Sequence, residues 1–276
     1  MKREIYEGYL VAETPIHHGG DEKTGAESLL RQMSYIVDGK RIEIPLISGN
    51  AIRGNLRRLL MADMLAQVRY KLSSAKIYHM LFSGGILETV SSKDTGVIDL
   101  DLKRKIRKTI IPIALLGSSL GNQIFEGKLK VSPAIPICKE LKDYLPDTCQ
   151  IQPTLSIYEL LDFDFATRKD DLREEKDENE QATQMMYSFQ VFIPGTPFHH
   201  SFSLNDVDDI EQSAFYRMLN LWKMNPYVGG KSSIGLGKVK ICYDYDDDAE
   251  ILYHNFLMEK QEEIREMLND LEEKWG

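Results

Sequence analysis

Apolar side chains along this chain either alternate with polar ones or recur at helical spacing, so the pattern predicts interleaved strands and helices. Alternation predicts strands at residues 5–13, 30–37, 127–133 and 238–243. Helical spacing predicts a helix over 48–68, with Ile52, Leu56 and Leu60 on one stripe and Ser48 or Asn50 as its N-cap. Further helices are expected around 215–222, before Pro226, and at the end of the chain.

The clearest local signal lies between residues 185 and 204. Apolar positions alternate at Met185, Tyr187, Phe189, Val191 and Ile193, and again at Phe198, His200, Phe202 and Leu204. Pro194 to Pro197 separates the two runs with turn residues. We therefore predict a β-hairpin here.

The order of these elements predicts one domain over residues 1–276, an α+β fold with a ferredoxin-like core and long insertions. Residues 84–127 have little clean periodicity and are interpreted as an insertion. Residues 162–180 are dense in both charges and should form a mobile excursion. Residues 254–276 predict an acidic amphipathic helix, with Ile264, Leu268, Leu271 and Trp275 on a stripe that must pack on something.

Charge is distributed unevenly over the 276 residues. The chain has 34 Lys and Arg against 43 Asp and Glu, a net charge of -9. Residues 244–276 hold 12 acidic and 3 basic side chains, so the preceding part is balanced. Within it, residues 40–76 and 103–130 each carry a net charge of +6. Such local clusters can bind phosphates in an acidic protein, because salt screens charges beyond about 8 Å. Two solvated helix faces explain the same charges, and composition alone favours that interpretation.

Several classes of protein are not expected from this sequence. There is no apolar run long enough for a transmembrane helix and no apolar region of a secretory signal near the N-terminus. Cys138, Cys149 and Cys242 lack CxxC spacing, which indicates reduced cytoplasmic thiols and no zinc site. Gly230-Lys231-Ser232 is not the end of a P-loop, because Asn225 replaces the first glycine of that motif. We expect a cytoplasmic protein without a metal or cofactor.

A phosphate-binding site is predicted where Ser48-Gly49-Asn50 leads into the first helix. The free amides of a helix N-terminus bind anions, and Gly49 would let a phosphate approach the backbone. Arg53 and Arg57 share a face at i and i+4, whereas Arg58 lies elsewhere. This suits a phosphodiester backbone, although a capped helix with surface arginines explains the same residues.

The paired histidines leave two interpretations open. His17 and His18 precede Gly19 and Gly20 in a predicted loop, where an exposed histidine can stack on a base or hydrogen-bond a phosphate. An unremarkable surface loop fits equally well. His199 and His200 point to opposite faces of a strand, so they cannot converge on a metal, and His200 is expected in the core.

Four blocks, in this order, resemble the RAMP superfamily of CRISPR systems, and within it the Cas seven family of guide-RNA backbone subunits. The blocks are residues 14–20, residues 44–60, residues 167–171 ahead of 186–198, and the glycine-rich segment 229–237. The helix block is more similar to type IV members than to type III or type I-D members.

The resemblance implies a modified RNA-recognition-motif fold and a CRISPR RNA-binding subunit that forms a filament along its guide in an antiviral or anti-plasmid ribonucleoprotein. Its partners would be guide RNA, further copies of itself, other CRISPR effector subunits, and a target DNA or RNA reached through base pairing, with no membrane. Residues 151–184 would form a thumb-like excursion. The residues implied to contact RNA are His18, Arg31, Ser48, Gly49, Asn50, Arg53, Arg57, Arg168, Lys169, Gly229, Gly230, Lys231 and Ser232.

Two other functions remain open. The resemblance places a catalytic Asp, in RNA-cleaving members, in the loop before Arg31, but this chain has Gly25-Ala26-Glu27-Ser28 there. Only Asp21 or Glu27 could take its role in a metal-dependent endoribonuclease, so we expect a protein that is not an enzyme. The third function is an acidic interaction module that binds a partner helix through the stripe from Ile264 to Trp275.

Overall fold

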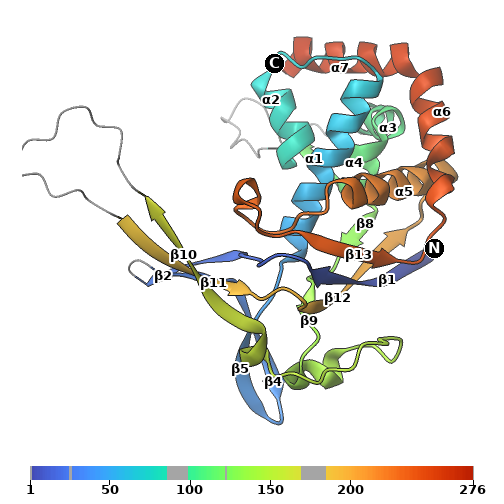
Figure 1. Cartoon of the computed structure of the whole chain (residues 1–276). Coiled ribbons are helices and arrows are strands. Elements are labelled where there is room, and N and C mark those ends of the chain that lie inside the picture. Colours follow the sequence, from blue (N-terminus) through green and yellow to red (C-terminus); the bar gives the residue numbers. More distant parts are fainter. Residues whose placement is uncertain (1, 25–26, 86–98, 122, 169–184, 276) are drawn as a thin grey trace, which may run out of the picture.

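The computed structural model describes residues 2–24, 27–85, 99–121, 123–168 and 185–275, which form the expected α+β fold (Figure 1). The main sheet consists of β13 (Val239–Tyr243), β1 (Arg3–Ala12), β12 (Pro197–Asn205), β8 (Leu129–Val131) and β9 (Ile135–Pro136). The other strands are β2 (Gly19–Thr24), β3 (Glu27–Leu30), β4 (Gln32–Val37), β5 (Lys40–Pro45), β6 (Ser118–Leu120), β7 (Gln123–Phe125), β10 (Leu161–Arg168) and β11 (Met185–Phe192).

Most of the α-helices lie on one side of the main sheet, above it in Figure 1. They are α1 (Gly49–Gln67), α2 (Ala75–Tyr78), α3 (Leu100–Thr109), α4 (Ile111–Leu116), α5 (Asp209–Met224), α6 (Ile251–Glu259) and α7 (Gln261–Trp275). The shorter segments are the π-helix η1 (His79–Ser83) and the 3-10 turns η2 (Lys139–Tyr144), η3 (Ile157–Leu160), η4 (Ser232–Ile234) and η5 (Asp247–Glu250).

The main sheet has the strand order of a ferredoxin-like fold. Its antiparallel order is β13-β1-β12-β8, and along the chain β1, α1, β8, β12, α5 and β13 alternate as strand, helix, two strands, helix and strand. β1 pairs with β12 from Arg3 opposite Asn205 to Val11 opposite Pro197. The expected ferredoxin-like core is therefore confirmed.

The core lies between this sheet and its helices. Leu10 of β1, Phe202 of β12 and Trp222 of α5 are buried there together with the predicted stripe of α1. Each fully buried aliphatic or aromatic side chain contributes about 1.5–3 kcal/mol, so this stripe rather than helix propensity holds α1 in place.

The predicted β-hairpin over 185–204 is wrong. β11 and β12 are both strands, but β11 pairs with β10 and β3 in a second sheet, whereas β12 pairs with β1 on one edge and with β8 and β9 on the other. Because both edges of β12 are occupied, β11 cannot pair with it. The turn between them is held instead by β1, since Gly195 N–H donates to the Ala12 carbonyl at 2.7 Å and Ala12 N–H donates to Thr196.

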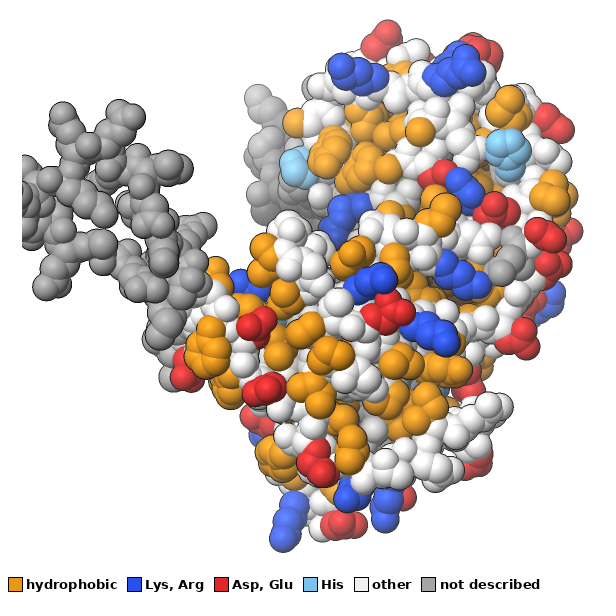
Figure 2. Space-filling view, viewed as in Figure 1, with side chains coloured by type: hydrophobic (Ala, Val, Ile, Leu, Met, Phe, Trp, Pro, Cys, Tyr) orange, Lys and Arg blue, Asp and Glu red, His pale blue; other side chains and the backbone are white. Residues whose placement is uncertain are grey.

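Two other expectations need correction. The predicted strand 30–37 is broken at Arg31, whose N–H donates to the His18 carbonyl and whose carbonyl accepts from Leu46, so β3 and β4 join different partners. Of the predicted mobile excursion, residues 162–168 belong to β10, paired in register with β11. Phe163 and Phe165 alternate with aspartates on this strand and remain exposed, and apolar side chains reach the surface there in Figure 2. Residues 169–180 of that excursion lie outside the described residues.

The segment interpreted as an insertion contributes to the core. Within 84–127, α4 is buried along its whole length and packs against α5 and α1. The strands β6 and β7 form a small hairpin after it. Residues 86–98 and 122 of this segment lie outside the description.

The acidic end of the chain is two helices, α6 and α7, that pack on their own chain. Ile264, Leu268 and Leu271 are at most 1% exposed. The carboxylate of Glu272 accepts from the backbone N–H groups of Ser73 and Ser74, both at 2.7 Å, at the start of α2. The predicted stripe is thus covered within the molecule, which leaves the interaction-module function without its proposed surface.

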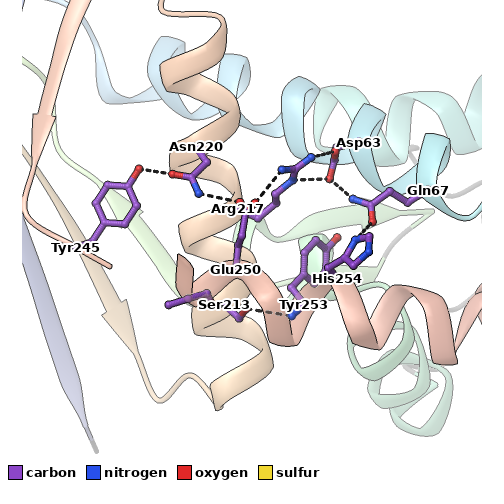
Figure 3. A network of polar contacts seen from close by, with 10 residues as sticks. Asp63, Gln67, Ser213, Arg217, Asn220, Tyr245, Glu250, Tyr253 and His254 are labelled. Atoms are coloured by element: carbon purple, nitrogen blue, oxygen red, sulfur yellow. Dashed lines mark hydrogen bonds and ion pairs between the residues drawn. The ribbon is translucent and has the colours of Figure 1, made fainter. Parts of the chain in front are cut away.

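A polar network joins the helices across the core (Figure 3). Arg217 of α5 donates to both oxygens of Asp63 on α1, at 2.6 and 3.1 Å, and to Glu250 of η5 at 3.1 Å. These three side chains are 23%, 11% and 27% exposed. Hydrogen bonding to Asp63 raises the pKa of Arg217, consistent with a charge held in place.

No helix in the described part of the chain is long and apolar enough to cross a membrane.

Replacing Arg217 should destabilise the fold, because Asp63 and Glu250 would keep their charges without this cation, with hydrogen bonds from Gln67 and Asn220 remaining. We expect Arg217→Met to lower the free energy of unfolding by about 2–4 kcal/mol, measured by urea denaturation. Lys260→Met is the matched control, since it breaks an exposed pair with Glu263 and should change stability by less than about 0.5 kcal/mol. Equal effects of the two variants would contradict a structural role for the network.

Candidate nucleic-acid interface

A cleft of about 840 Å³ lies along the N-terminal half of α1. One wall is α1 itself, and the opposite walls come from the His18 loop, the glycine-rich segment, and the ends of η1, α4 and β7. Residues that the sequence predicted for RNA contact and that line the cleft are His18, Asn50, Arg53, Arg57, Gly229 and Ser232. Side chains far apart in the sequence thus meet in one cleft.

The start of α1 is capped as predicted. Ser48 Oγ accepts from Ala51 N–H at 3.3 Å, and the same oxygen lies 3.1 Å from Nε2 of His18. Burial is the largest cause lowering the pKa of His18, followed by the charge of Arg31. A neutral His18 therefore joins its loop to the helix cap at neutral pH.

Gly49 has a different role from the predicted one. A Cβ on Gly49 would lie 2.4 Å from the Val131 carbonyl oxygen and 2.7 Å from that of Ser132. The glycine is needed for close packing of α1 on β8, so this side of the helix start is filled by protein. Room for a ligand lies on the Asn50 side, which borders the cleft.

Arg53 and Arg57 point toward the end of α4. Arg57, 6% exposed, donates to the carbonyls of Leu116 at 2.6 Å and Gly117 at 2.7 Å, and Arg53 donates to Leu116 as well. These carbonyls form the negative end of the α4 dipole, where cations are stabilised. Gly84 lies over the guanidinium of Arg57, since a Cβ there would be 3.6 Å from its Nη2.

The two guanidiniums remain a source of positive potential. Burial, and then the charge of Arg53, lower the pKa of Arg57 to about 10, so Arg57 stays charged at neutral pH. Burial also lowers the pKa of Arg53, whose buried Nε has no hydrogen-bond partner. Neither arginine forms an ion pair among the residues that the structure describes. Backbone carbonyls offset their desolvation but do not neutralise them.

Arg58 was misplaced by the sequence interpretation. It is exposed and lines the same cleft as Arg53, while Arg57 is the buried one. Arg58 shares the cleft wall of α1 with Ala51, Gly54 and Asn55, which lie three, four or seven residues before it on the same face of the helix. The small and polar side chains at these positions are the sequence signal that could have predicted an exposed, ligand-facing side of α1 that includes Arg58.

At Gly54 no side chain of the described residues covers the backbone of α1 on the cleft wall. A Cβ on Gly54 would meet no heavy atom within 4 Å, although a glycine inside a helix costs about 1 kcal/mol relative to alanine. Packing does not require the glycine. An open helix surface lets another backbone approach closely.

The glycine-rich segment is held against the His17 loop. Gly230 N–H donates to the His17 carbonyl at 2.8 Å, and a Cβ on Gly229 would lie 2.5 Å from that oxygen. His17 is buried, with Nδ1 2.7 Å from the Gln190 carbonyl, and burial lowers its pKa. Lys231 adopts φ of +62° and places Nζ 4.4 Å from the centre of the Phe189 ring. The predicted Lys231 is therefore directed toward β11, outside the cleft lining.

Other predicted residues are not brought into the cleft. Arg31 is exposed between β3 and β4, and Glu27 is exposed at the start of β3. The backbones of Asp21 and Arg168 belong to β2 and β10, but their side chains lie outside the description, as does the whole of Lys169. The described residues contain no group of three or more His, Cys, Asp or Glu placed to hold a metal ion.

Comparison with known proteins extends this picture. The family model of the RAMP superfamily matches residues 9–240. A chain of a solved structure titled "Type IV-B CRISPR Complex" is similar in fold, with a TM-score of 0.60 and 19% sequence identity over 87% of this chain and 90% of that chain. No curated protein matches the sequence significantly.

Substitution of Arg57 should reduce the stability of the fold, whereas substitution of Arg58 should not. Arg57→Ala removes the donor to the Gly117 carbonyl and one of the two donors to the Leu116 carbonyl, and it empties a buried position, so we expect the free energy of unfolding to fall by about 2–4 kcal/mol in urea denaturation. Arg58→Ala removes the same charge from an exposed position and should change stability by less than about 0.5 kcal/mol. A stable Arg57→Ala protein would show that the contact with α4 is dispensable.

Proposed function

The chain belongs to the RAMP superfamily, and from this membership we propose that it is a non-catalytic subunit that binds guide RNA in a CRISPR effector complex. The cleft beside α1 would hold the sugar-phosphate backbone of the guide. The bases would remain free to pair with target DNA or RNA, so that pairing reads the sequence while the protein follows backbone shape and charge.

The observation that carries this proposal is the charge and shape of the cleft. Arg53, Arg57 and Arg58 supply three positive charges to its lining, against the single carboxylate of Glu126. The backbone of α1 is bare at Gly54, next to Arg58. A positive groove with one open helix face fits a chain of phosphates better than a small apolar ligand.

The three arginines would act differently. Arg58, exposed and without an ion pair among the described residues, would contact phosphate directly. Arg57 would act through its field and by fixing α4, because it is buried and donates to two backbone carbonyls at the end of that helix. Arg53 lies between these cases, with one donor on Leu116.

Neutral groups would complete the contact. Asn50 and Ser232 border the cleft from opposite walls, and each has a side chain able to hydrogen-bond a phosphate oxygen. His18 would orient the loop through Ser48. Beyond this cleft, the guide would contact Arg31. It would also contact Arg168 and Lys169 of the thumb-like excursion.

The length of the cleft favours several copies along one guide. From Asn50 to Arg58, α1 rises about 12 Å at 1.5 Å per residue. At about 3.4 Å per nucleotide along a strand, this wall faces roughly three or four nucleotides. A guide that pairs over about 20 nucleotides would therefore need several copies of the chain, together with other effector subunits. The fold similarity to a chain of the type IV-B complex supports a type IV-like subunit.

Arg58 offers the cleanest test, because it is not used by the fold. We expect Arg58→Gln to weaken the binding of a 20-nucleotide single-stranded RNA several-fold, whatever its sequence. The slope of log affinity against log salt concentration should fall by about 0.7, the value for one phosphate contact on a single strand. Fluorescence anisotropy across a salt series measures both quantities.

Lys260→Gln removes one exposed charge from the C-terminal helices and is the matched control for Arg58. Its salt slope should equal that of the unmodified chain. If Arg58→Gln binds RNA with unchanged affinity and slope, the cleft is not the guide site.

Gly54 tests shape without changing charge. We expect Gly54→Ala to raise the free energy of unfolding by up to about 1 kcal/mol and to bind RNA nearly as before. Gly54→Gln should fold equally well, because glutamine is a good helix former, yet its side chain fills the open wall and should reduce RNA affinity at least 10-fold. Full binding by Gly54→Gln would contradict close approach of RNA to α1.

A further inference from the structure

Helix α3 carries the densest run of positive charge in the chain. Five of the six residues from 103 to 108 are Lys or Arg. The helix buries Ile106 and Thr109, so the cations occupy the opposite side and the flanks. Arg104, Lys105 and Lys108 are exposed, and Lys103 and Arg107 are half-buried.

These charges are not used by the fold. Among the residues that the structure describes, the five cations form one ion pair, Arg104 with Asp101 at 3.5 Å, between side chains 73% and 95% exposed. Such a pair contributes little to stability. Lys128, from the same basic segment of the sequence, instead forms a half-buried pair with Glu211 at 2.5 Å.

The surface of α3 is distinct from the guide cleft. None of its five cations lines that cleft. Lys105 borders a separate groove against α7, where Asp270, Glu273 and Lys274 also lie, so charges of both signs balance on that side. Arg104 and Lys108, one helical turn apart, do not border this groove and carry the outward-facing charge.

The composition of this face favours a polyanion over a protein partner. Protein interfaces have an apolar centre with charged groups at the rim. On the solvent side of α3 the exposed apolar side chain is Leu100, at the first turn, and the rest of that face is charged. Closely spaced lysines and arginines without an apolar anchor bind phosphates through release of counterions.

We propose that the solvent face of α3 is a second nucleic-acid site, which binds the phosphodiester backbone of a strand other than the one in the cleft. The contacts are to phosphates and read no bases. The strand is either single-stranded or part of a duplex, since both present the same phosphate chemistry. This site does not depend on the proposed guide function and would stand if the cleft held another ligand.

The test uses the full chain with Arg104, Lys105 and Lys108 all changed to Gln, a good helix former that removes the charge. Two labelled probes are titrated across a salt series: a 20-nucleotide single-stranded RNA and a 20-base-pair DNA duplex. Loss of three phosphate contacts should lower the salt slope by about 2.7 for the duplex or about 2.1 for the single strand. The probe whose slope falls by its own expected value identifies the kind of strand, and a fall with both probes means that the face binds either kind.

The matched control changes Lys2, Arg41 and Lys260 to Gln, which removes the same three charges from exposed, ion-paired positions. Its slopes should equal those of the unmodified chain. An equal drop in the control would mean that only net charge matters and would overturn the proposal. Unchanged slopes for both probes in the α3 variant would also overturn it and would leave an acidic protein surface as the partner of α3.

A variant with two substitutions instead of three tests the same site if the triple variant does not fold. Arg104→Gln with Lys108→Gln changes two exposed side chains and should lower the duplex slope by about 1.8. Adding Arg58→Gln to the triple variant separates the two sites, because distant sites act additively. If the guide proposal alone fails, Arg58→Gln has no effect while the α3 variants still lower the slope.

Discussion

The cleft depends on a buried guanidinium that meets backbone carbonyls instead of a carboxylate. Arg57 leaves α1 and donates to Leu116 and Gly117 at the end of α4. An acidic partner would have cancelled its charge, whereas carbonyl dipoles offset the cost of burial and leave a net positive charge in place. The same contact therefore fixes one wall of the cleft and gives the cleft its sign.

The ferredoxin-like core explains why the other walls meet there. β1 runs in the middle of the main sheet, so the loop after it emerges beside the start of α1. The glycine-rich segment precedes β13, which pairs with β1, and this segment contacts the loop after β1 through Gly230 and His17. The pairing of β1 with β13 thus brings the loop after β1, the start of α1 and the glycine-rich segment together, although they are far apart in the sequence. The outward face of α3 lies apart from these walls, and among the described residues its five cations form one exposed ion pair, Arg104 with Asp101.

Local signals in the sequence predicted elements well but not their partners. Ser48 as the cap of α1, the buried stripe of α1 and the course of α5 follow from spacing and capping rules, and all are found. The β11–β12 hairpin failed because alternation identifies strands, while pairing depended on β1 and β10. Spacing placed Arg53 and Arg57 on one side of α1, yet only the position of α4 determined that Arg57 is buried and that Arg58 faces the cleft.

Crosslinking of bound RNA tests the account most directly. RNA carrying 4-thiouridine would be bound to the full chain, irradiated, and the linked peptides identified by mass spectrometry. Crosslinks should fall on residues 14–20, 49–58 and 227–234, the segments that surround the cleft. The face of the main sheet away from the helices carries Tyr9, which is 38% exposed, and sheets of RNA-recognition motifs stack bases on aromatic rings. Crosslinks on β1 and β13, with none on the N-terminal half of α1, would contradict the account.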